Sequence, residues 1–345
     1  MQFPGQGKPP VGIIFDSDFG NHIDSVLALA LLYGFDGKNE VRVASVSVSK
    51  KNLKSAALCE VVGRFYAGPI TPFTRILPVG MSTEEKMPED TPMLAVAARY
   101  ANGIHKLNDT AEVAALIRNA LTAQYDQHSV VLAAGPLTNL ARLLELPGIK
   151  DLIAHKVRFL VAETGVFPDG KPDANIHADV TAARQVLAQW PGPVVACGEE
   201  IGETLAFPGE SIERDFAWSQ AHPVADAYRA AQPMPYNAPA RSMAAALYAV
   251  RPNEGYFKLS SPGTITVAAD SHTKFTSSAE GRHRYLISDP AQKDRIVQVF
   301  REVASAKPVP RVPRFRQLQE QKKTEDERRL RKTRSREPSR VAIKS

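Results

Sequence analysis

Cysteine is scarce in this chain, since only Cys59 and Cys197 occur among 345 residues. Two cysteines so far apart exclude a disulfide framework and indicate a reducing compartment. Long apolar runs are missing as well: the longest mostly apolar stretch, residues 26–35, has ten residues, whereas a membrane-spanning helix needs about 20. We therefore expect a cytoplasmic protein with no signal peptide, no transmembrane segment and no membrane partner.

Acidic residues are outnumbered, because 43 Lys and Arg face 37 Asp and Glu and give a formal charge of +6. Residues 307–345 hold 14 basic and 5 acidic residues, so residues 1–306 carry a net charge of −3. The basic segment has too few large apolar side chains to offset the entropy of ordering it. We expect one folded domain over residues 1–305 and a disordered basic tail over residues 306–345, with nucleic acid as a partner only through that tail.

Strand-like and helix-like segments alternate along most of the chain. Strand patterns occur at residues 11–15, 41–48, 129–134, 157–162 and 194–197, and helical patterns at residues 23–33, 55–66, 110–123, 137–144 and 180–189. Later candidates are less regular: a helix at residues 243–250 and strands near residues 264–267 and 284–287. Strands joined by helices predict an α/β fold with an open, mostly parallel sheet covered on both faces. Functional residues are then expected just after the strands.

Three carboxylates, Asp16, Asp18 and Asp24, follow the first predicted strand. Side chains at i and i+2 of an extended segment point to one side, so Asp16 and Asp18 emerge together, and Asp24 begins the next helix. Carboxylates this close raise one another's pKa unless a cation neutralises them, and a hard divalent ion is a natural companion. The alternative is that Asp18 and Asp24 are turn and cap residues, which is a common use of aspartate.

Residues 13–25 resemble the N-terminal signature of the inosine-uridine preferring nucleoside hydrolases, in its longer form Asp-Thr-Asp-x-Gly-Asn-Asp-x-Asp-Asp. Residues 132–141 are similar to the family's strand-turn-helix with Gly-x-Leu-Thr-Asn, and residues 173–184 to its Glu-x-Asn segment and the helix after it. The order and spacing of these segments hold from about residue 11 to residue 286. The resemblance is therefore specific, although each motif alone is weak.

The resemblance implies an open α/β fold with calcium at the base of a pocket, where the ion holds a water and the ribose hydroxyls. It implies hydrolysis of a ribonucleoside to ribose and free base, a purine or pyrimidine salvage reaction, by a homo-oligomer. Asp18 would be the general base, and Asp24, Asp173 and Asn175 would contact the sugar. The metal ligands would be Asp16, Asp18, Asp24 and the main-chain carbonyl of Ala134.

The chain departs from the family pattern at the metal. Ser25 and Ser242 stand where the pattern has calcium-binding aspartates, and His22 stands where the longer motif has aspartate. Calcium affinity follows the number of charged oxygen ligands, so we expect a weakened or lost site. Arg241 lies where many relatives have an aromatic residue or histidine, and a guanidinium stays protonated and cannot be a general acid.

Three interpretations stay open at this point. In the first, the protein is an active N-ribohydrolase whose metal is held by Asp18, Asp24, carbonyls and waters, with Arg241 supplying charge once carried by the ion. Alternatively, the fold is kept and catalysis is lost, which leaves a nucleoside-binding, ribose-binding or scaffold protein. In the third interpretation His22 joins Asp16 and the other aspartates as a ligand for zinc or manganese, which imidazole suits.

Overall fold

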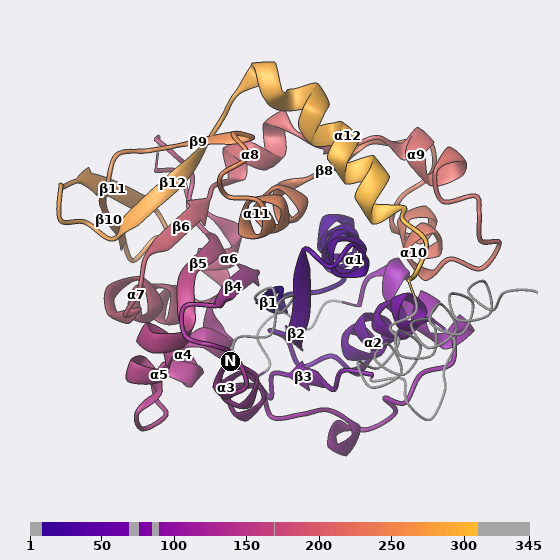
Figure 1. Cartoon of the computed structure of the whole chain (residues 1–345), viewed down its shortest axis with the longest axis horizontal. Helices are drawn as coiled ribbons and strands as arrows, with labels where there is room; N and C mark the ends of the chain where they lie inside the picture. Colours follow the sequence, from indigo (N-terminus) through magenta and orange to yellow (C-terminus); the bar gives the residue numbers. More distant parts are fainter. Residues whose placement is uncertain (1–8, 69–75, 85–89, 169, 310–345) are drawn as a thin grey trace, which may run out of the picture.

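The computed structural model describes residues 9–68, 76–84, 90–168 and 170–309. Within them a ten-stranded mixed sheet runs in the order β11-β10-β12-β6-β5-β4-β1-β2-β3, with β9 paired to β12 (Figure 1). Its strands are β1 (Val11–Ser17), β2 (Val41–Val48), β3 (Val79–Met81), β4 (Ser129–Ala134), β5 (Val157–Glu163), β6 (Val194–Cys197), β9 (Phe257–Leu259), β10 (Gly263–Val267), β11 (Thr273–Ser277) and β12 (His283–Ser288). Two short strands, β7 (Ala206–Phe207) and β8 (Ala238–Pro239), form a separate pair.

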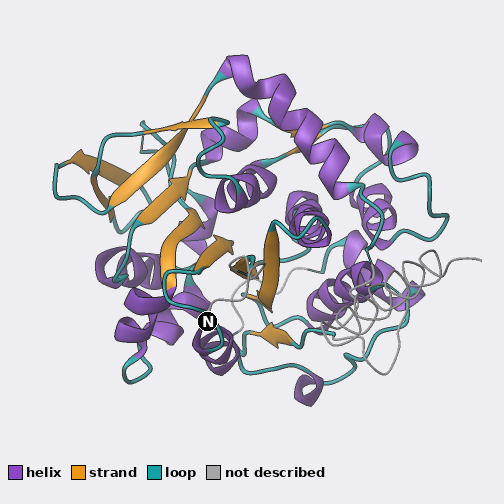
Figure 2. Cartoon of the chain, in the orientation of Figure 1, coloured by secondary structure: helices purple, strands orange, loops and turns teal. Residues whose placement is uncertain are grey.

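Helices lie on both faces of the sheet (Figure 2). They are α1 (Ile23–Gly37), α2 (Leu53–Ala67), α3 (Val113–Thr122), α4 (Thr138–Leu144), α5 (Ile149–Lys156), α6 (Ala174–Ala178), α7 (Val180–Gln189), α8 (Glu199–Thr204), α9 (Gly209–Arg214), α10 (Pro223–Ala231), α11 (Arg241–Val250) and α12 (Lys293–Ala304). Short 3-10 helices span Pro92–Arg99, Leu107–Asp109 and Pro290–Gln292.

Two apolar cores result from the alternation of side chains along the strands. Ile13 and Phe15 of β1 belong to the core under α1, α2, α10, α11 and α12, while Ile14 belongs to the core under α3, α4, α5 and α7. Both faces of β1 are therefore buried, which explains why its sequence is a continuous apolar run rather than an alternating one.

The predicted α/β class and the mostly parallel sheet are confirmed. Neighbouring strands pair in parallel along the row β3, β2, β1, β4, β5, β6 and β12. Strands β9, β10 and β11 join the sheet by antiparallel pairing. The sequence pattern missed several short elements and the amphipathic helix α12. No helix in the described residues is long and apolar enough to cross a membrane. The predicted tail falls mainly on residues 310–345, outside the described residues.

The sheet changes direction of growth between β1 and β4. The chain passes from β1 to β2 and β3 on one side, and then returns to place β4, β5 and β6 on the other side of β1. Helix α1, which follows β1, packs in one core, and α4, which follows β4, packs in the other, so the two helices begin on opposite faces of the sheet. Such a switch point is where open α/β sheets bind ligands.

Helix α1 approaches α12 so closely that Gly34 has no room for a side chain. A Cβ atom there would lie 2.0 Å from the backbone oxygen of Val303. We expect Gly34→Ala to destabilise the protein by about 1–3 kcal/mol, because α12 must move to relieve the overlap. Urea unfolding would measure this.

Gly37, in the same helix, is the matched control for this prediction. An added Cβ there would meet only the Val309 side chain, at 3.5 Å. Gly37→Ala should therefore be neutral or slightly stabilising. Equal unfolding midpoints for Gly34→Ala and Gly37→Ala would contradict the proposed overlap.

Candidate active site

Five buried carboxyl groups gather at the carboxyl edge of the sheet around its switch point. Asp16 is in β1, Asp18 follows this strand, Asp24 is in the first turn of α1, Glu163 ends β5 and Asp173 caps the N-terminus of α6. Asp18 interacts electrostatically with Asp16, Asp24 and Glu163. Asp173 and Glu163 both act on the charge of Arg241. The structure thus brings the three predicted aspartates together and adds Glu163 from β5.

Asp16 is held rigidly by donors from two other elements. Its Oδ1 accepts hydrogen bonds from the Ser47 hydroxyl of β2 at 2.5 Å and from Asn139 Nδ2 of α4 at 2.8 Å. Asn139 also donates to the carbonyl of Val48. Burial raises the pKa of Asp16 to about 6, although these two hydrogen bonds oppose the shift. Asp16 therefore links β1, β2 and α4 beneath Asp18.

Asp18 is connected to a buried lysine through an asparagine. Asn21 Nδ2 donates to Asp18 Oδ2 at 3.0 Å, and Lys50 Nζ donates to Asn21 Oδ1. Burial raises the pKa of Asp18 to about 6, and the charge of Asp24 adds to this rise, while His22 and Lys50 oppose it. A carboxyl group with a pKa near neutrality is suited to accept a proton in catalysis.

Asp24 and Glu163 meet the start of α11 at Ser242. The backbone N–H of Ser242 donates to Asp24 Oδ2 at 3.0 Å. Burial raises the pKa of Glu163 to about 8, and the charge of Asp24 adds to this rise, whereas Arg241 and a hydrogen bond from Ser242 lower it. Glu163 Oε1 is buried and has no hydrogen-bond partner among the described residues, so this oxygen is available to a ligand.

Replacing Glu163 by glutamine should change how stability depends on pH. Its pKa is raised from 4.5 to about 8, so between these values the folded state binds more protons than the unfolded state, and the folded state loses stability as pH rises. Glu163→Gln removes this loss, and its melting temperature should fall less than that of the wild type between pH 5 and pH 8.

The matched control is Glu213→Gln, because Glu213 has its pKa lowered by Arg229. That substitution should leave the decline of melting temperature over the same pH range unchanged. If Glu163→Gln declined as steeply as the wild type, Glu163 would not be the buried acid that titrates there.

Arg241 brings a permanent positive charge to the same group. Its Nη2 lies 2.8 Å from Asp173 Oδ2, and its Nε and Nη2 donate to the carbonyls of Cys197 and Gly165 at 3.0 and 3.3 Å. Burial alone would lower the pKa of Arg241, but the carboxylates of Asp173 and Glu163 raise it above its ordinary value. Arg241 is therefore always charged and cannot deliver a proton.

The oxygen atoms of this site do not fit the calcium that the family resemblance implies. Ser25, at one expected ligand position, closes its own turn, since its hydroxyl donates to the carbonyl of His22 and accepts from the N–H of Gly20. At the other expected position, the backbone N–H of Ser242 donates to Asp24, and its side chain forms a hydrogen bond with Glu163. Neither serine offers the charged oxygen that calcium binding relies on.

The remaining predicted ligands are also engaged by protein donors. Asp16, Asp18 and Asp24 accept the hydrogen bonds described above, and the carbonyl of Ala134 accepts the N–H of Asp18 at 3.4 Å. Across the described residues, no group of three or more His, Cys, Asp or Glu side chains is arranged to hold a metal ion. This geometry also argues against the zinc or manganese site with His22.

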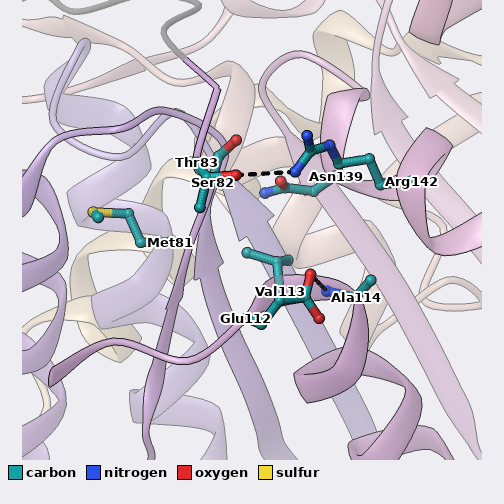
Figure 3. Close-up of a pocket in the computed structure, with 8 residues that line it drawn as sticks. All are labelled: Met81, Ser82, Thr83, Glu112, Val113, Ala114, Asn139 and Arg142. Atoms are coloured by element: carbon teal, nitrogen blue, oxygen red, sulfur yellow. Dashed lines mark hydrogen bonds between the residues drawn. The ribbon is translucent and has the colours of Figure 1, made fainter. Parts of the chain in front are cut away.

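A cavity of about 10 Å³ lies beside Asn139, close to the size of one water molecule (Figure 3). It is lined also by Ser82 and Arg142, and Arg142 Nη1 donates to Thr83 at 3.1 Å. Asn139 lines this cavity and also bonds to Asp16, and within the part of the chain that the structure describes its Oδ1 is buried without a partner. The cavity is too small to be the ligand pocket, and it lies beside the asparagine that holds Asp16.

Sequence reasoning found some site residues and missed others. Asp173 lies in the group, bound to Arg241, and Asn175 is anchored to it by a 3.0 Å hydrogen bond from its Nδ2 to the carbonyl of Glu163. Lys50 and Glu163 were not singled out. Both lie at the end of a strand or just after it, so the rule that ligands sit beyond the carboxyl ends of strands would have indicated them.

Comparison with solved structures agrees with this architecture. An inosine-uridine preferring nucleoside hydrolase from Bacillus anthracis is 17% identical, with a TM-score of 0.63 over 86% of this chain and 99% of that chain. An inosine-guanosine nucleoside hydrolase is 16% identical, with a TM-score of 0.65 over 85% and 98%. The type III effector protein XopQ, complexed with adenosine diphosphate ribose, is 14% identical, with a TM-score of 0.61 over 88% and 96%. These likenesses show the shared fold.

A family model gives the assignment independently of these structures. Among curated proteins, no sequence matches this one. The model described as inosine-uridine preferring nucleoside hydrolase, however, matches residues 13–307, which include every carboxylate of the site. This chain therefore belongs to the inosine-uridine preferring nucleoside hydrolase family.

Proposed function

We propose that the carboxylate pocket hydrolyses the N-glycosidic bond of a ribonucleoside and releases ribose and the free base. The observation that carries this proposal is the set of buried acids at the switch point, beside strand ends whose buried polar atoms find no hydrogen-bond partner among the described residues: Ser17 Oγ, Ser49 Oγ, Glu163 Oε1 and Thr164 Oγ1. Unpaired buried polar atoms are costly, so a polar ligand would satisfy them. The hydroxyls of a ribose are such a ligand.

The catalytic base in this proposal is Asp18. Its carboxylate accepts a proton from a water molecule, whose oxygen then forms a bond to the anomeric carbon of the ribose. The bond from that carbon to the base breaks, and its electron pair stays on the departing nitrogen, which takes up a proton from solvent, while Asp18 returns to solvent the proton that it accepted. The sugar gains positive charge as this bond breaks, and the surrounding carboxylates stabilise it.

Substrate contacts are assigned to Asp24, Asp173 and Asn175. Asp24 is fixed by the N–H of Ser242, Asp173 by Arg241 and Asn175 by the carbonyl of Glu163. Each side chain is thus oriented before the substrate arrives, which lowers the entropic cost of positioning the sugar. The identity of the base is left open, and purine or pyrimidine salvage is the role that this reaction would serve in the cytoplasm.

The test is an assay of the purified full chain for ribose release from inosine, uridine, guanosine and adenosine. Release of ribose and free base in equal amounts is the expected result. Binding of a nucleoside without turnover would replace this proposal by the nucleoside-binding alternative. Sedimentation measurements on the same sample would test the expected homo-oligomer.

A further inference from the structure

Two cationic side chains, Lys50 and Arg241, approach the carboxylates in the part of the chain that the structure describes. Lys50 is fully buried, and its Nζ donates to Asn21, which in turn donates to Asp18. Buried lysine is rare and costly unless acidic groups compensate its charge. The charge of Lys50 lowers the pKa of Asp18, so the pair is electrostatically coupled through the intervening amide.

The second cation, Arg241, acts on Asp173 and Glu163. Arg241 begins α11, and its side chain is only 12% exposed, while the Asp173 carboxylate that it contacts is not exposed at all. The charge of Arg241 also acts on Glu163. Its neighbour Ser242 occupies a position where the family pattern has a calcium-binding aspartate. The same helix end thus carries one negative charge fewer and one positive charge more than that pattern predicts.

We propose that Lys50 and Arg241 supply the counter-charge of this pocket, and that the protein binds no divalent cation there. Lys50 serves the Asp18 side through Asn21, and Arg241 serves Asp173 and Glu163. A divalent ion entering this group would meet two fixed positive charges in a buried setting, where Coulomb repulsion is poorly screened. One oxygen of each of Asp16, Asp18 and Asp24 already accepts a protein hydrogen bond, and the ion would compete with these donors.

Metal content and thermal unfolding of the full chain test this inference. Wild-type protein, purified without chelator, should contain calcium, zinc and manganese far below one ion per chain. Millimolar calcium chloride and EDTA should give melting temperatures within about 1 °C of each other, because a ligand that does not bind the folded state does not stabilise it. One tightly held ion per chain, or a clear rise with calcium, would overturn the proposal.

A second experiment uses a variant whose charges at positions 241 and 242 match the family pattern more closely. Arg241→Ala combined with Ser242→Asp removes the cation and returns a carboxylate, so this variant should gain calcium affinity. Its melting temperature should rise by about 5 °C when calcium exceeds its Kd about 100-fold. No calcium response in the folded variant would show that Arg241 and Ser242 do not decide metal binding, and would overturn their assigned role.

The control is Arg229→Ala, which removes an exposed arginine paired with Glu213 and should create no calcium response. Arg241→Lys serves as a second variant, since it keeps the positive charge and should remain insensitive to calcium even if the double variant does not fold. A calcium response in Arg241→Lys equal to that of the double variant would contradict a role for charge.

The inference rests on the proposed function for the identity of the pocket, but its readouts do not require turnover. If no nucleoside releases ribose and the wild type still contains no metal, the proposed function fails and the counter-charge assignment stands. If ribose release depends on added calcium and is abolished by EDTA, the hydrolase function stands and the counter-charge assignment fails.

Discussion

Replacing Asp18 by asparagine should lower the rate of ribose release by about 10²–10⁴-fold, the range that a positioned general base contributes. Asparagine has nearly the same shape and cannot accept the proton of the attacking water. The hydrogen bond from Asn21 to Asp18 Oδ2 can be kept by the amide oxygen, so the fold should survive. Initial rates at saturating nucleoside, together with a melting curve, would measure the effect.

Asp179→Asn is the matched control for the Asp18 variant. Asp179 is also a buried aspartate, but it caps α7, accepts from Thr138 at 2.8 Å and is not one of the five carboxyl groups of the site. Asparagine caps helices as well as aspartate does, so activity should change little. Comparable losses in the two variants would mean that Asp18 acts through stability rather than through proton transfer.

Removing Arg241 should have the largest effect on stability. Arg241→Met leaves Asp173 buried without its cationic partner and removes one donor each from the carbonyls of Cys197 and Gly165. Breaking a buried ion pair from one side costs about 3–5 kcal/mol, because the remaining charge is uncompensated. Denaturant unfolding would show a lower midpoint with an unchanged slope.

A double-mutant cycle with Asp173→Asn separates the ion pair from the other contacts of Arg241. Asparagine can still cap α6 through the N–H of Ile176, so the double variant should be less destabilised than the sum of the two single variants. The exposed pair of Arg229 and Glu213, taken through the same cycle, should yield about 0–1 kcal/mol. Strict additivity at Arg241 and Asp173 would contradict a coupled buried pair.

The central fold could be predicted from the sequence because apolar runs indicate its strands, helical apolar patterns indicate its helices, and both signals are local in the chain. Apolar runs such as residues 129–134 and 194–197 are fully buried strands, and their bounds match β4 and β6. Elements at the edge of the fold carry weaker signals: β3 has three residues, and α12 is a mostly polar helix with four buried side chains. Antiparallel pairing of β10 and β11 depends on contacts that a periodic pattern does not encode.

The candidate site could be predicted only where its residues share a stretch of chain. Asp16, Asp18 and Asp24 lie within one strand, turn and helix, so their proximity follows from the local geometry. The partners that change their chemistry come from elsewhere: Glu163 from β5, and Arg241 from the start of α11. The sequence shows that serine replaces the expected aspartate at position 242. The hydrogen bonds of Ser242 to Asp24 and Glu163 appear only in the folded chain.

The hydrogen bond from Ser242 to Asp24 joins residues 218 positions apart in the sequence. Contacts of such long range form late in folding, because closing a long loop costs entropy before any contact rewards it. During synthesis, the aspartates of the first strand and helix leave the ribosome long before α11 exists. A nascent or truncated chain would therefore lack the arginine that compensates Asp173 and Glu163, and the pocket becomes electrostatically complete only when nearly the whole domain has been made.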